Sequence, residues 1–472
     1  MGDKRDIHLD LPAAVLRVIE LLEDGGFEAY VVGGCVRDAL MGRACSDYDV
    51  TTNALCSQME PLFAAAGLRV IETGIAHGTI TVLADADTAG KGAGAGVFAE
   101  RSSSEGPCPE SPSGDDRVLP IEVTTYRVDG PYLDSRHPES VSFTRDLRED
   151  LARRDFTINA MAYSPKRGLV DLYGGRDDLA AGVIRAVGDA DKRFKEDALR
   201  IMRALRFAAQ LEFTIESATA AALRENAPLL ANIAVERCAA ELVKLVCGPG
   251  FRMPIQDYTE VLGVVLPELL PMKGCEQNNA YHPYDVLGHT LVAMENIPAQ
   301  PELRMAALLH DCGKPATYND GGPNQFNPQQ DRRHFFNHPA VGAKIARAAL
   351  ERLHYPRDFI EMVVFVVGEH DAYLKEDDVN IKQWLHRIGP ERMSALLYMK
   401  HADISALDPR CHEWLPIFDR IRANMERILA SGGLLVARAV GREGRRPDRR
   451  RCGTGAGTGG DARAPARCCH RR

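Results

Sequence analysis

The spacing of apolar and polar positions changes near residue 175, from a mixture of helical and strand-like patterns to an almost wholly helical one. Residues 14–26 place apolar side chains at helical spacing and end in two glycines, which predicts a helix and its stop. Short runs rich in β-branched residues predict strands at 27–34, 47–53, 77–84 and 120–128. We therefore expect residues 1–165 to form an α/β head, a small mixed sheet flanked by helices.

Beyond residue 175 the pattern is almost wholly helical. Amphipathic helices are predicted at 197–211, 234–247, 285–298, 302–314, 340–353 and 358–371. We divide this part into an all-α neck and body at 166–272 and an all-α domain at 273–436.

Two segments lack any periodicity. Residues 86–117 are rich in Gly, Ala, Ser and Pro and lie between two predicted strands, which indicates a hairpin with a long mobile insertion at its tip. Residues 437–472 carry eleven arginines against three acidic residues, so the rest of the chain has a net charge of −16. We expect this tail to be disordered, although attraction to phosphate also makes an RNA contact plausible.

Composition narrows the class of protein. A length of 472 residues predicts two to four domains, and hydrophobic and charged fractions of 45% and 26% are typical of globular chains. There is no run of 18 apolar residues, which argues against a membrane span. Twelve cysteines without a CxxC pair indicate reduced thiols and hence a cytoplasmic protein.

The first candidate for chemistry is a glycine turn. Gly33 and Gly34 end a predicted strand, and a predicted helix begins just after them. Glycines let backbone N–H groups approach a phosphate, a helix N-terminus favours anions, and Arg37 could fork onto a phosphate oxygen. Alone the pattern is weak, because many such turns bind nothing.

The second candidate is a pair of carboxylates ten residues further on. Asp47 and Asp49 are two residues apart, so on a strand they point to the same side. Their repulsion is relieved by a cation between them, and hard oxygen ligands suit Mg²⁺. Glu122, in a neighbouring predicted strand, could supply a third carboxylate. The alternative is a solvated acidic turn.

Four segments, taken in order, give a far more specific signal. GGCVRDALMGRACSDYDVTT, RRDFTINAMAY, DLYGGRDDL and EDALRIMRALRFAAQL resemble the tRNA nucleotidyltransferase family, which includes bacterial CCA-adding enzymes and poly(A) polymerases. The resemblance implies a nucleotidyltransferase head followed by a helical neck, body and tail. It also implies roles for single residues: Gly34 and Arg37 in the triphosphate turn, Asp47 and Asp49 as metal ligands, Arg154 as a nucleotide contact, and Asp197, Arg200, Arg203 and Arg206 on the helix that reads the nucleotide.

The last of these segments has a physical logic of its own. Asp197 and Arg200 are three residues apart, so we expect neighbours on one helix face. A carboxylate beside a guanidinium matches the amine and acceptor of cytosine and adenine, and it mismatches uracil and guanine. Arg206 lies half a turn away from Asp197, so we expect Arg203 and Arg206 to contact phosphates or neighbouring carboxylates.

A second set of residues consists of histidines and aspartates. His289, His310, Asp311, His338, His370 and Asp403 follow one another in an order that resembles the HD-domain phosphohydrolases. Imidazoles and carboxylates on converging helices suit one or two divalent ions, here a transition metal. The resemblance implies that His289, His310, Asp311 and Asp403 are core ligands and that His338 and His370 are additional ones. His334 is an alternative to His338, and we assign structural or solvent-exposed roles to His282, His354, His386, His401 and His412.

Together these features favour a template-independent enzyme that builds or repairs the 3′-terminal CCA of tRNA from CTP and ATP with Mg²⁺. The HD domain would add hydrolysis of phosphomonoesters or 2′,3′-cyclic phosphodiesters. Alternatives are a poly(A) polymerase, an enzyme that adds only CC or only A, an HD phosphohydrolase with a nucleotide- or RNA-binding head, and a non-catalytic tRNA-binding protein. The intact carboxylate pair argues against the last two. The sequence leaves the oligomeric state open.

Overall fold

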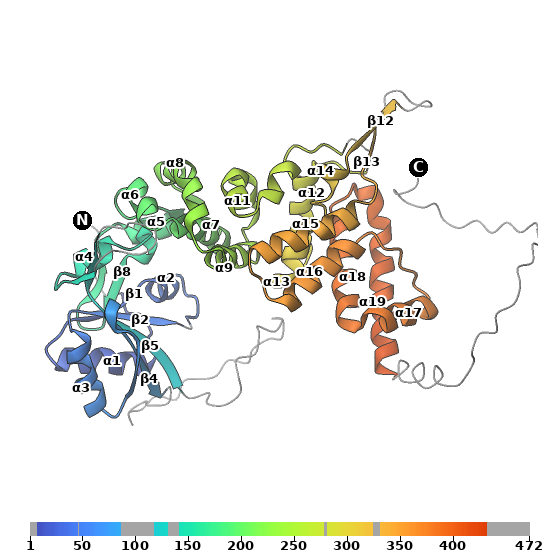
Figure 1. The fold of residues 1–472 in the computed structure, drawn as a ribbon. Helices are drawn as coiled ribbons and strands as arrows, with labels where there is room; N and C mark the ends of the chain where they lie inside the picture. The colour runs from blue at the N-terminus through green and yellow to red at the C-terminus, as the bar shows by residue number, and fades with distance from the viewer. Residues whose placement is uncertain are drawn as a thin grey trace, which may run out of the picture. The chain divides into compact units, whose positions relative to one another are not determined.

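The computed structural model describes residues 7–45, 47–85, 118–130, 141–277, 281–323 and 331–431. Two compact units are present (Figure 1). Unit 1 runs to Glu241 and includes Pro249–Phe251, and unit 2 comprises Leu242–Gly248 and the chain from Arg252 onward. The predicted insertion at 86–117 and the predicted tail at 437–472 lie outside the described residues.

Unit 1 is built on a seven-stranded sheet. Its strands, in spatial order, are β3 (Arg69–Gly74), β4 (Thr79–Asp85), β5 (Val118–Thr125), β2 (Tyr48–Thr52), β1 (Ala29–Val32), β8 (Met161–Ser164) and β9 (Gly168–Asp171). Only the β2–β5 pair is parallel, and the other pairs are antiparallel. The sheet is therefore mixed, as predicted, and β9 carries it beyond the predicted boundary at residue 165.

The predicted hairpin around residues 86–117 is present as the β4–β5 pair. Its register runs from Thr79 opposite Thr124 to Asp85 opposite Val118. The ends of the predicted insertion therefore leave the sheet side by side, so that an extra segment at this point does not interrupt the pairing.

The alternation of side chains along each strand gives the sheet two buried faces. Val31 and Val50 lie in the main core with α1 (Ala13–Asp24) and α3 (Cys56–Ala65). Tyr30 and Val32 point the other way and pack with Leu151 of α4 (Leu147–Ala152). Residues of β2 that are offset by one from Val50 therefore share the α4 side of the sheet.

Helices follow the sheet in unit 1. They are α5 (Gly175–Ala181), α6 (Ala190–Glu196), α7 (Leu199–Leu211), α8 (Ser217–Asn226) and the beginning of α9 (Val235–Val246), while α2 (Gly34–Leu40) lies earlier, directly after β1. The amphipathic α7 has ten buried residues, so it forms the spine of this region. The short parallel pair of β10 (Val183–Ile184) and β11 (Thr214–Ile215) packs against it.

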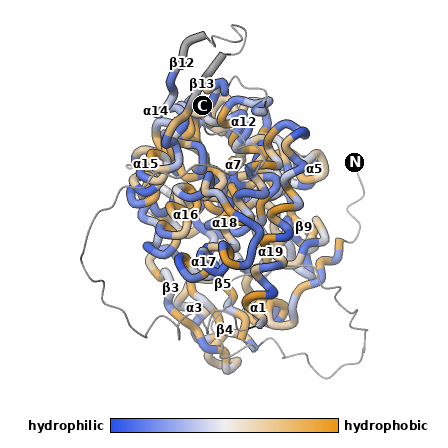
Figure 2. Tube along the Cα trace, turned by 90° about the vertical axis from the view of Figure 1, so that its right-hand side faces the viewer, coloured by the Kyte–Doolittle hydropathy of each residue, from blue (hydrophilic) through white to orange (hydrophobic). Residues whose placement is uncertain are grey.

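Unit 2 is predominantly helical. Its helices after α9 are α10 (Arg252–Asp257), α11 (Thr259–Val265), α12 (Val286–Glu295), α13 (Pro301–Leu309), α14 (Lys314–Thr317), α15 (His338–Arg352), α16 (Arg357–Glu369), α17 (Asp378–Ile388), α18 (Pro390–Ser405) and α19 (Leu415–Ala430). Figure 2 shows hydrophobic and hydrophilic residues alternating along the helices, which is the pattern of amphipathic elements. No helix within the described ranges is long and apolar enough to cross a bilayer.

The helical prediction for residues beyond 175 was incomplete in two places. The β10–β11 pair and the antiparallel pair of β12 (Asn319–Pro323) and β13 (Asp331–His334) interrupt the helices. These strands are two to five residues long, and such short pieces carry too little alternation to be seen in a sequence.

Candidate active site and candidate metal centre

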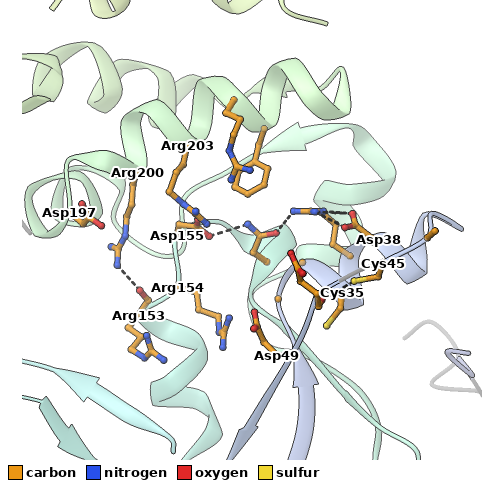
Figure 3. Close-up of a pocket in the computed structure, with 18 residues that line it drawn as sticks. Cys35, Asp38, Cys45, Asp49, Arg153, Arg154, Asp155, Asp197, Arg200 and Arg203 are labelled. Atoms are coloured by element: carbon orange, nitrogen blue, oxygen red, sulfur yellow. Dashed lines mark hydrogen bonds and ion pairs between the residues drawn. The ribbon is translucent and has the colours of Figure 1, made fainter. Parts of the chain in front are cut away.

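A polar pocket of about 480 Å³ opens in unit 1, and we call it the head pocket (Figure 3). It is lined by Gly33, Gly34, Cys35, Arg37, Asp38, Ala44, Cys45, Asp47, Asp49, Arg153, Arg154, Asp155, Asn159, Asp197, Arg200, Arg203, Arg206 and Phe207. All the head residues singled out in the sequence except Glu122 are in this set. Its volume falls within the usual range of small-molecule sites, and its lining is strongly charged.

The sheet explains why the glycine turn and the carboxylates meet. Strand β1 runs antiparallel to β2 with Val31 opposite Val50, so the end of β1 lies beside the beginning of β2. Gly33 continues β1 into α2 at this edge, and Asp49 enters β2 at the same edge. Two motifs that are separated in sequence therefore become neighbours through one strand pair.

Strand β5 brings the third carboxylate alongside. Glu122 is the parallel partner of Asp49, so the two residues lie at the same level on adjacent strands. Partial removal from water, together with the nearby charges of Glu122 and Asp47, raises the pKa of Asp49 despite the opposing effect of Arg154. Carboxylates that repel each other in this way fit a divalent cation bound between them.

The turn between β1 and α2 depends on glycine. Gly33 has a φ of +84°, which only glycine adopts without strain, and a Cβ atom there would lie 3.1 Å from a guanidinium nitrogen of Arg154. Arg154 also reaches Asp150 at 3.5 Å, and its Nε atom is buried without a hydrogen-bond partner. The turn thus leaves room for a guanidinium directly beside the carboxylates.

Arg37 is oriented by hydrogen bonds to neighbouring side chains. Its Nε and Nη2 atoms donate to Asp38 at 2.9 Å each, and its Nη1 donates to Asn159 at 2.7 Å. Asn159 in turn donates to Asp155 at 3.2 Å. These bonds connect Arg37 to Asp155, and because Arg37 also lines the head pocket, its contact with phosphate stays a prediction.

The same network continues to α7 through Asp155. The Nε and Nη2 atoms of Arg203 lie 2.8 and 2.6 Å from one carboxylate oxygen of Asp155, and the backbone N–H of Phe156 donates to the other oxygen at 2.8 Å. Burial alone would raise the pKa of Asp155, but Arg203 and Asn159 outweigh it and lower the pKa to about 2. Sequence reasoning missed Asp155 and Asn159, because neither side chain stands out without its partner.

An aromatic ring was also missed. Phe207 of α7 is buried, and the guanidinium carbons of Arg37, Arg203 and Arg206 lie 5.1, 5.3 and 4.0 Å from its ring centroid. A ring face attracts cations, so Phe207 lets three arginines approach one another. The sequence predicts only that Phe207 is one more apolar residue of an amphipathic helix.

The predicted helical pair of Asp197 and Arg200 needs correction. Asp197 does not belong to a helix but lies between α6 and α7, where its carboxylate accepts from the N–H of Leu199 at 3.0 Å. Aspartate favours such a capping position over the interior of a helix, which explains the break. Both residues nevertheless line the head pocket.

Arg200 has fixed partners on the pocket wall. Its guanidinium donates to the carbonyl oxygens of Arg153 and Arg193 at 2.8 and 3.1 Å and to Glu196 at 2.9 Å.

For the next two arginines of α7, Arg203 and Arg206, the structure confirms the predicted contact with neighbouring carboxylates. Arg203 pairs with Asp155, and Arg206 lies 2.6 Å from Glu241.

Unit 2 contains a separate group of histidines and aspartates. His289 lies on α12, His310 and Asp311 follow α13, and His338 begins α15. His370 follows α16, and Asp403 lies on α18. We call these six residues the histidine cluster. They are the six predicted ligands. The four histidines are at most 2% exposed, and Asp311 is 1% exposed.

The histidine cluster consists of two ligand groups that meet at Asp311. His289, His310 and Asp403 form one group, and Asp311, His338 and His370 form the other. One carboxylate oxygen of Asp311 lies 3.2 Å from His310 Nε2, while the other lies 3.3 Å from His338 Nε2. Asp311 is therefore positioned as a bridge between two neighbouring sites.

The backbone orients three of the imidazoles. The Nδ1 atoms of His310, His338 and His370 lie 2.8, 2.9 and 2.7 Å from the carbonyl oxygens three residues earlier. If each Nδ1 carries the proton, each Nε2 presents its lone pair to the cluster. Burial lowers the pKa of His370 to about 4, with His310 and His338 acting in the same direction, which keeps this imidazole neutral near pH 7.

Unsatisfied atoms in the histidine cluster fit a metal ion. His310 Nε2 and both carboxylate oxygens of Asp311 are buried without a hydrogen-bond partner of good geometry. Such atoms are costly unless something binds them, and a set of imidazole nitrogens and carboxylate oxygens suits a divalent transition metal. The residues present therefore fit the group that the sequence implies.

Several neighbours of the histidine cluster were not predicted. Asp371 lies 3.6 Å from His338 Nε2, and Lys314 lies 2.6 Å from Asp311. The ring of His282, expected to be structural or exposed, lies 5.3 Å from that of His289, and burial lowers the pKa of His282 to about 2. The alternative ligand His334 lies in β13, and its side chain is outside the described part of the structure.

Three family models match the chain in sequence order. They are the Poly A polymerase head domain at residues 29–92 and 110–185, the Probable RNA and SrmB-binding site of polymerase A at 212–271, and the HD domain at 279–406. The first match contains the glycine turn and the carboxylates, and the third contains the histidine cluster.

Individual relatives agree with these models. A CCA-adding enzyme of Lactiplantibacillus plantarum is 42% identical over 264 residues, and one of Leuconostoc mesenteroides is 45% identical over 231 residues. These alignments cover 55% and 49% of the chain and the same shares of the relatives, so the chain spans about half the length of the curated relatives it matches.

A solved structure extends the likeness over most of the chain. The Bacillus stearothermophilus CCA-adding enzyme in complex with CTP has a TM-score of 0.58 and 28% identity, with 92% of this chain and 88% of that chain covered. From these matches and the order of the three domains we conclude that the chain belongs to the family of poly(A) polymerases and CCA-adding enzymes and that it carries an HD domain.

Proposed function

We propose that the chain adds CMP and AMP residues from CTP and ATP to the 3′ end of tRNA, building or repairing the terminal CCA and releasing pyrophosphate. The observation that carries this proposal is the head pocket, where a carboxylate pair, a glycine turn and arginines from three elements meet. The relatives named above are CCA-adding enzymes, one of them solved with CTP. We infer a cytoplasmic site of action, because tRNA, CTP and ATP are available there.

We assign the metal-binding role to Asp47 and Asp49, with Glu122 as a third carboxylate on the adjacent strand. Bound Mg²⁺ would lower the pKa of the attacking 3′-hydroxyl and neutralise charge on the triphosphate and the departing pyrophosphate. Arg154 is the best-placed cation for the triphosphate, because it lies between Gly33 and Asp49 and has an unsatisfied Nε. We also assign Gly34 and Arg37 to the turn that holds the triphosphate, where Arg37 would neutralise phosphate charge and both residues line the head pocket.

Base selection is assigned to Asp197 and Arg200. Arg200 is fixed by two carbonyl oxygens and Glu196, and Asp197 is fixed by the backbone N–H of Leu199, the first residue of α7. A pair that cannot rearrange cannot adapt to the wrong base edge, so uracil and guanine leave buried polar groups unpaired. This rigidity supplies selectivity for cytosine and adenine without a nucleic-acid template.

The HD domain supports a second proposed activity. We propose that the histidine cluster binds one or two divalent transition-metal ions and hydrolyses phosphomonoesters or 2′,3′-cyclic phosphodiesters. A bound metal would supply a nucleophilic water near neutral pH. The buried oxygens of Asp311 that lack hydrogen bonds favour this reading over a purely structural cluster.

The first test separates full CCA addition from its close alternatives. We expect purified protein to extend a tRNA that ends at the discriminator base by CCA when CTP and ATP are mixed, and by C residues alone with CTP. A poly(A) polymerase would add a long A tract, and a partial enzyme would stop after CC or accept only a CC end. In the same assay, Asp47→Ala and Asp49→Ala should reduce incorporation by about 100-fold or more, because the metal loses a ligand.

The matched control for that test is Glu72→Gln. Glu72 is an exposed carboxylate of β3 outside the head pocket, so its variant should incorporate nucleotides at the parental rate. Near-normal incorporation by either aspartate variant in Mg²⁺ would remove the assignment of the metal ligands. Circular dichroism of each variant checks that the head is folded.

Selectivity gives a second prediction. Asp197→Ala and Arg200→Ala should raise the use of UTP and GTP relative to CTP and ATP by about tenfold, since each removes half of the discriminating hydrogen-bond pattern. The measurement is single-turnover incorporation with each nucleotide alone, and Lys195→Ala, on the exposed side of α6, is the control. An equal fall for all four nucleotides would show that the pair is structural instead.

A third prediction concerns the contact between Asp155 and Arg203. Removing Arg203 leaves the carboxylate of Asp155 without its counter-charge, and because the Arg203 side chain is partly exposed, Arg203→Ala should destabilise unit 1 by about 1–3 kcal/mol. The folded pKa of Asp155 is about 2 against an ordinary 3.8, so the pair stabilises the head above about pH 4 and loses this effect as the pH falls toward 2. Asp155→Asn should flatten that part of the curve of stability against pH, and an unchanged curve would contradict the assignment.

The two sites should also function separately. Replacing His310 and Asp311 with alanine should abolish binding of transition metal, measured by elemental analysis, and remove any phosphatase or cyclic phosphodiesterase activity. CCA addition should remain largely intact, because no residue of the head pocket is altered. His386→Ala, on α17, is the control. A parental protein that binds no transition metal would argue for a scaffolding role, and loss of CCA addition in a folded variant would show that unit 2 is needed to hold the tRNA.

A further inference from the structure

Two cysteines face each other in the head pocket, and the proposed reaction uses neither. Cys35 lies in the first turn of α2, and Cys45 lies in the segment that leads from α2 to β2. Both thiols border the same pocket, and each is close enough to influence the other. Figure 3 shows the two residues next to one another on the α2 side of the pocket, beside Asp49.

Both sulfur atoms also contact the backbone around the carboxylate pair. The Cys45 thiol donates to the carbonyl oxygen of Asp47 at 3.0 Å, and the Cys35 thiol lies 3.4 Å from the carbonyl oxygen of Val32 and near the backbone of Asp49. The thiol pair thus lies between the glycine turn and the two proposed metal ligands. A change in the bonding of the sulfur atoms changes the contacts of both motifs.

The two thiols differ in access. Cys35 is only 3% exposed, whereas Cys45 is partly exposed at the pocket. A small oxidant that enters the pocket therefore reaches Cys45 first, and the buried Cys35 is the second thiol to react. This is the arrangement of a redox-sensitive pair, in which an accessible sulfur is oxidised and a neighbouring sulfur resolves it.

We propose that Cys35 and Cys45 form a reversible disulfide when the chain meets a hydroperoxide, and that this bond switches nucleotide addition off. The sulfur of Cys45 attacks the terminal peroxide oxygen, the O–O bond breaks, and the thiol proton leaves with the departing oxygen as water or alcohol. The sulfur of Cys35 then attacks the sulfenic acid on Cys45, forming the S–S bond and releasing water. The pair loses two electrons and two protons in all, the peroxide is reduced, and a thiol reverses the step.

Formation of the bond disturbs the proposed active site directly. The Cys45 sulfur must give up the Asp47 carbonyl, and the segment before β2 is drawn toward α2. A shift of about 1 Å in a catalytic group can cost about 100-fold in rate, and the two carboxylates are the nearest groups. This consequence rests on the proposed function, whereas formation of the bond itself does not.

The test uses the full chain, reduced and then treated with hydrogen peroxide. After free thiols are blocked, mass spectrometry of a protease digest should reveal a peptide that contains Cys35 cross-linked to one that contains Cys45. Incorporation of CMP should fall by about 100-fold and return after dithiothreitol. Because Cys56 lies close in sequence to Cys45, Cys56→Ser serves as the matched control and should behave as the parent does.

Cys35→Ser and Cys45→Ser should each yield no such cross-link and should keep most of their own reduced activity after the same treatment. Absence of the cross-link in the parental chain, while its other thiols react, would overturn the proposal, and so would a cross-linked chain with undiminished incorporation. A reduced chain that adds no nucleotide would count against the proposed function instead. Mass spectrometry would still decide in that case whether the bond forms.

Discussion

The ion pair between the buried Asp155 and the partly exposed Arg203 fixes the neck helix α7 to the head, and the geometry of the head pocket depends on it. Two guanidinium nitrogens share one oxygen of Asp155, and the other oxygen accepts from Phe156 and Asn159. A charge taken out of water is tolerated only when it is paired and hydrogen-bonded, and this carboxylate meets both conditions. Asn159 also accepts a hydrogen bond from Arg37, which lies in the helix that follows the glycine turn, so the network connects Asp155 to that turn.

The head also shows which parts of a site a sequence can reveal. The glycine turn and the Asp47/Asp49 pair are local, so their spacing predicts their chemistry. The hairpin of β4 and β5 was predictable for the same reason. The register that sets Glu122 beside Asp49 is a tertiary property of a parallel strand pair, and no local pattern contains it. Asp155, Asn159 and Phe207 were missed because their roles arise only from partners distant in sequence.

The break between α6 and α7 illustrates a prediction that failed for a local reason. Periodicity placed Asp197 on the same helix as Arg200, because apolar residues continue at helical spacing across the break. Aspartate competes with the backbone of a helix and is better used as a cap, and Asp197 accepts from the N–H of Leu199. Because of this break, the carboxylate of Asp197 lies just before α7, where Asp197 lines the head pocket. In the HD domain the set of six residues that come together was predictable from their order, whereas the approach of Asp371 and His282 required the packed helices.

The hydrogen bonds of the two buried aspartates explain why one is structural and the other is a candidate ligand. Both oxygens of Asp155 are fully used by protein donors, so nothing further can bind there without breaking the network. The oxygens of Asp311 are equally buried, yet they lack hydrogen bonds of good geometry and face imidazole nitrogens. Lys314 neutralises part of that charge at 2.6 Å, but one ammonium cannot satisfy two oxygens that point to different histidines. A cation between the imidazoles would satisfy them, so the incomplete pairing at Asp311 is the observation that favours the proposed metal site over a scaffold.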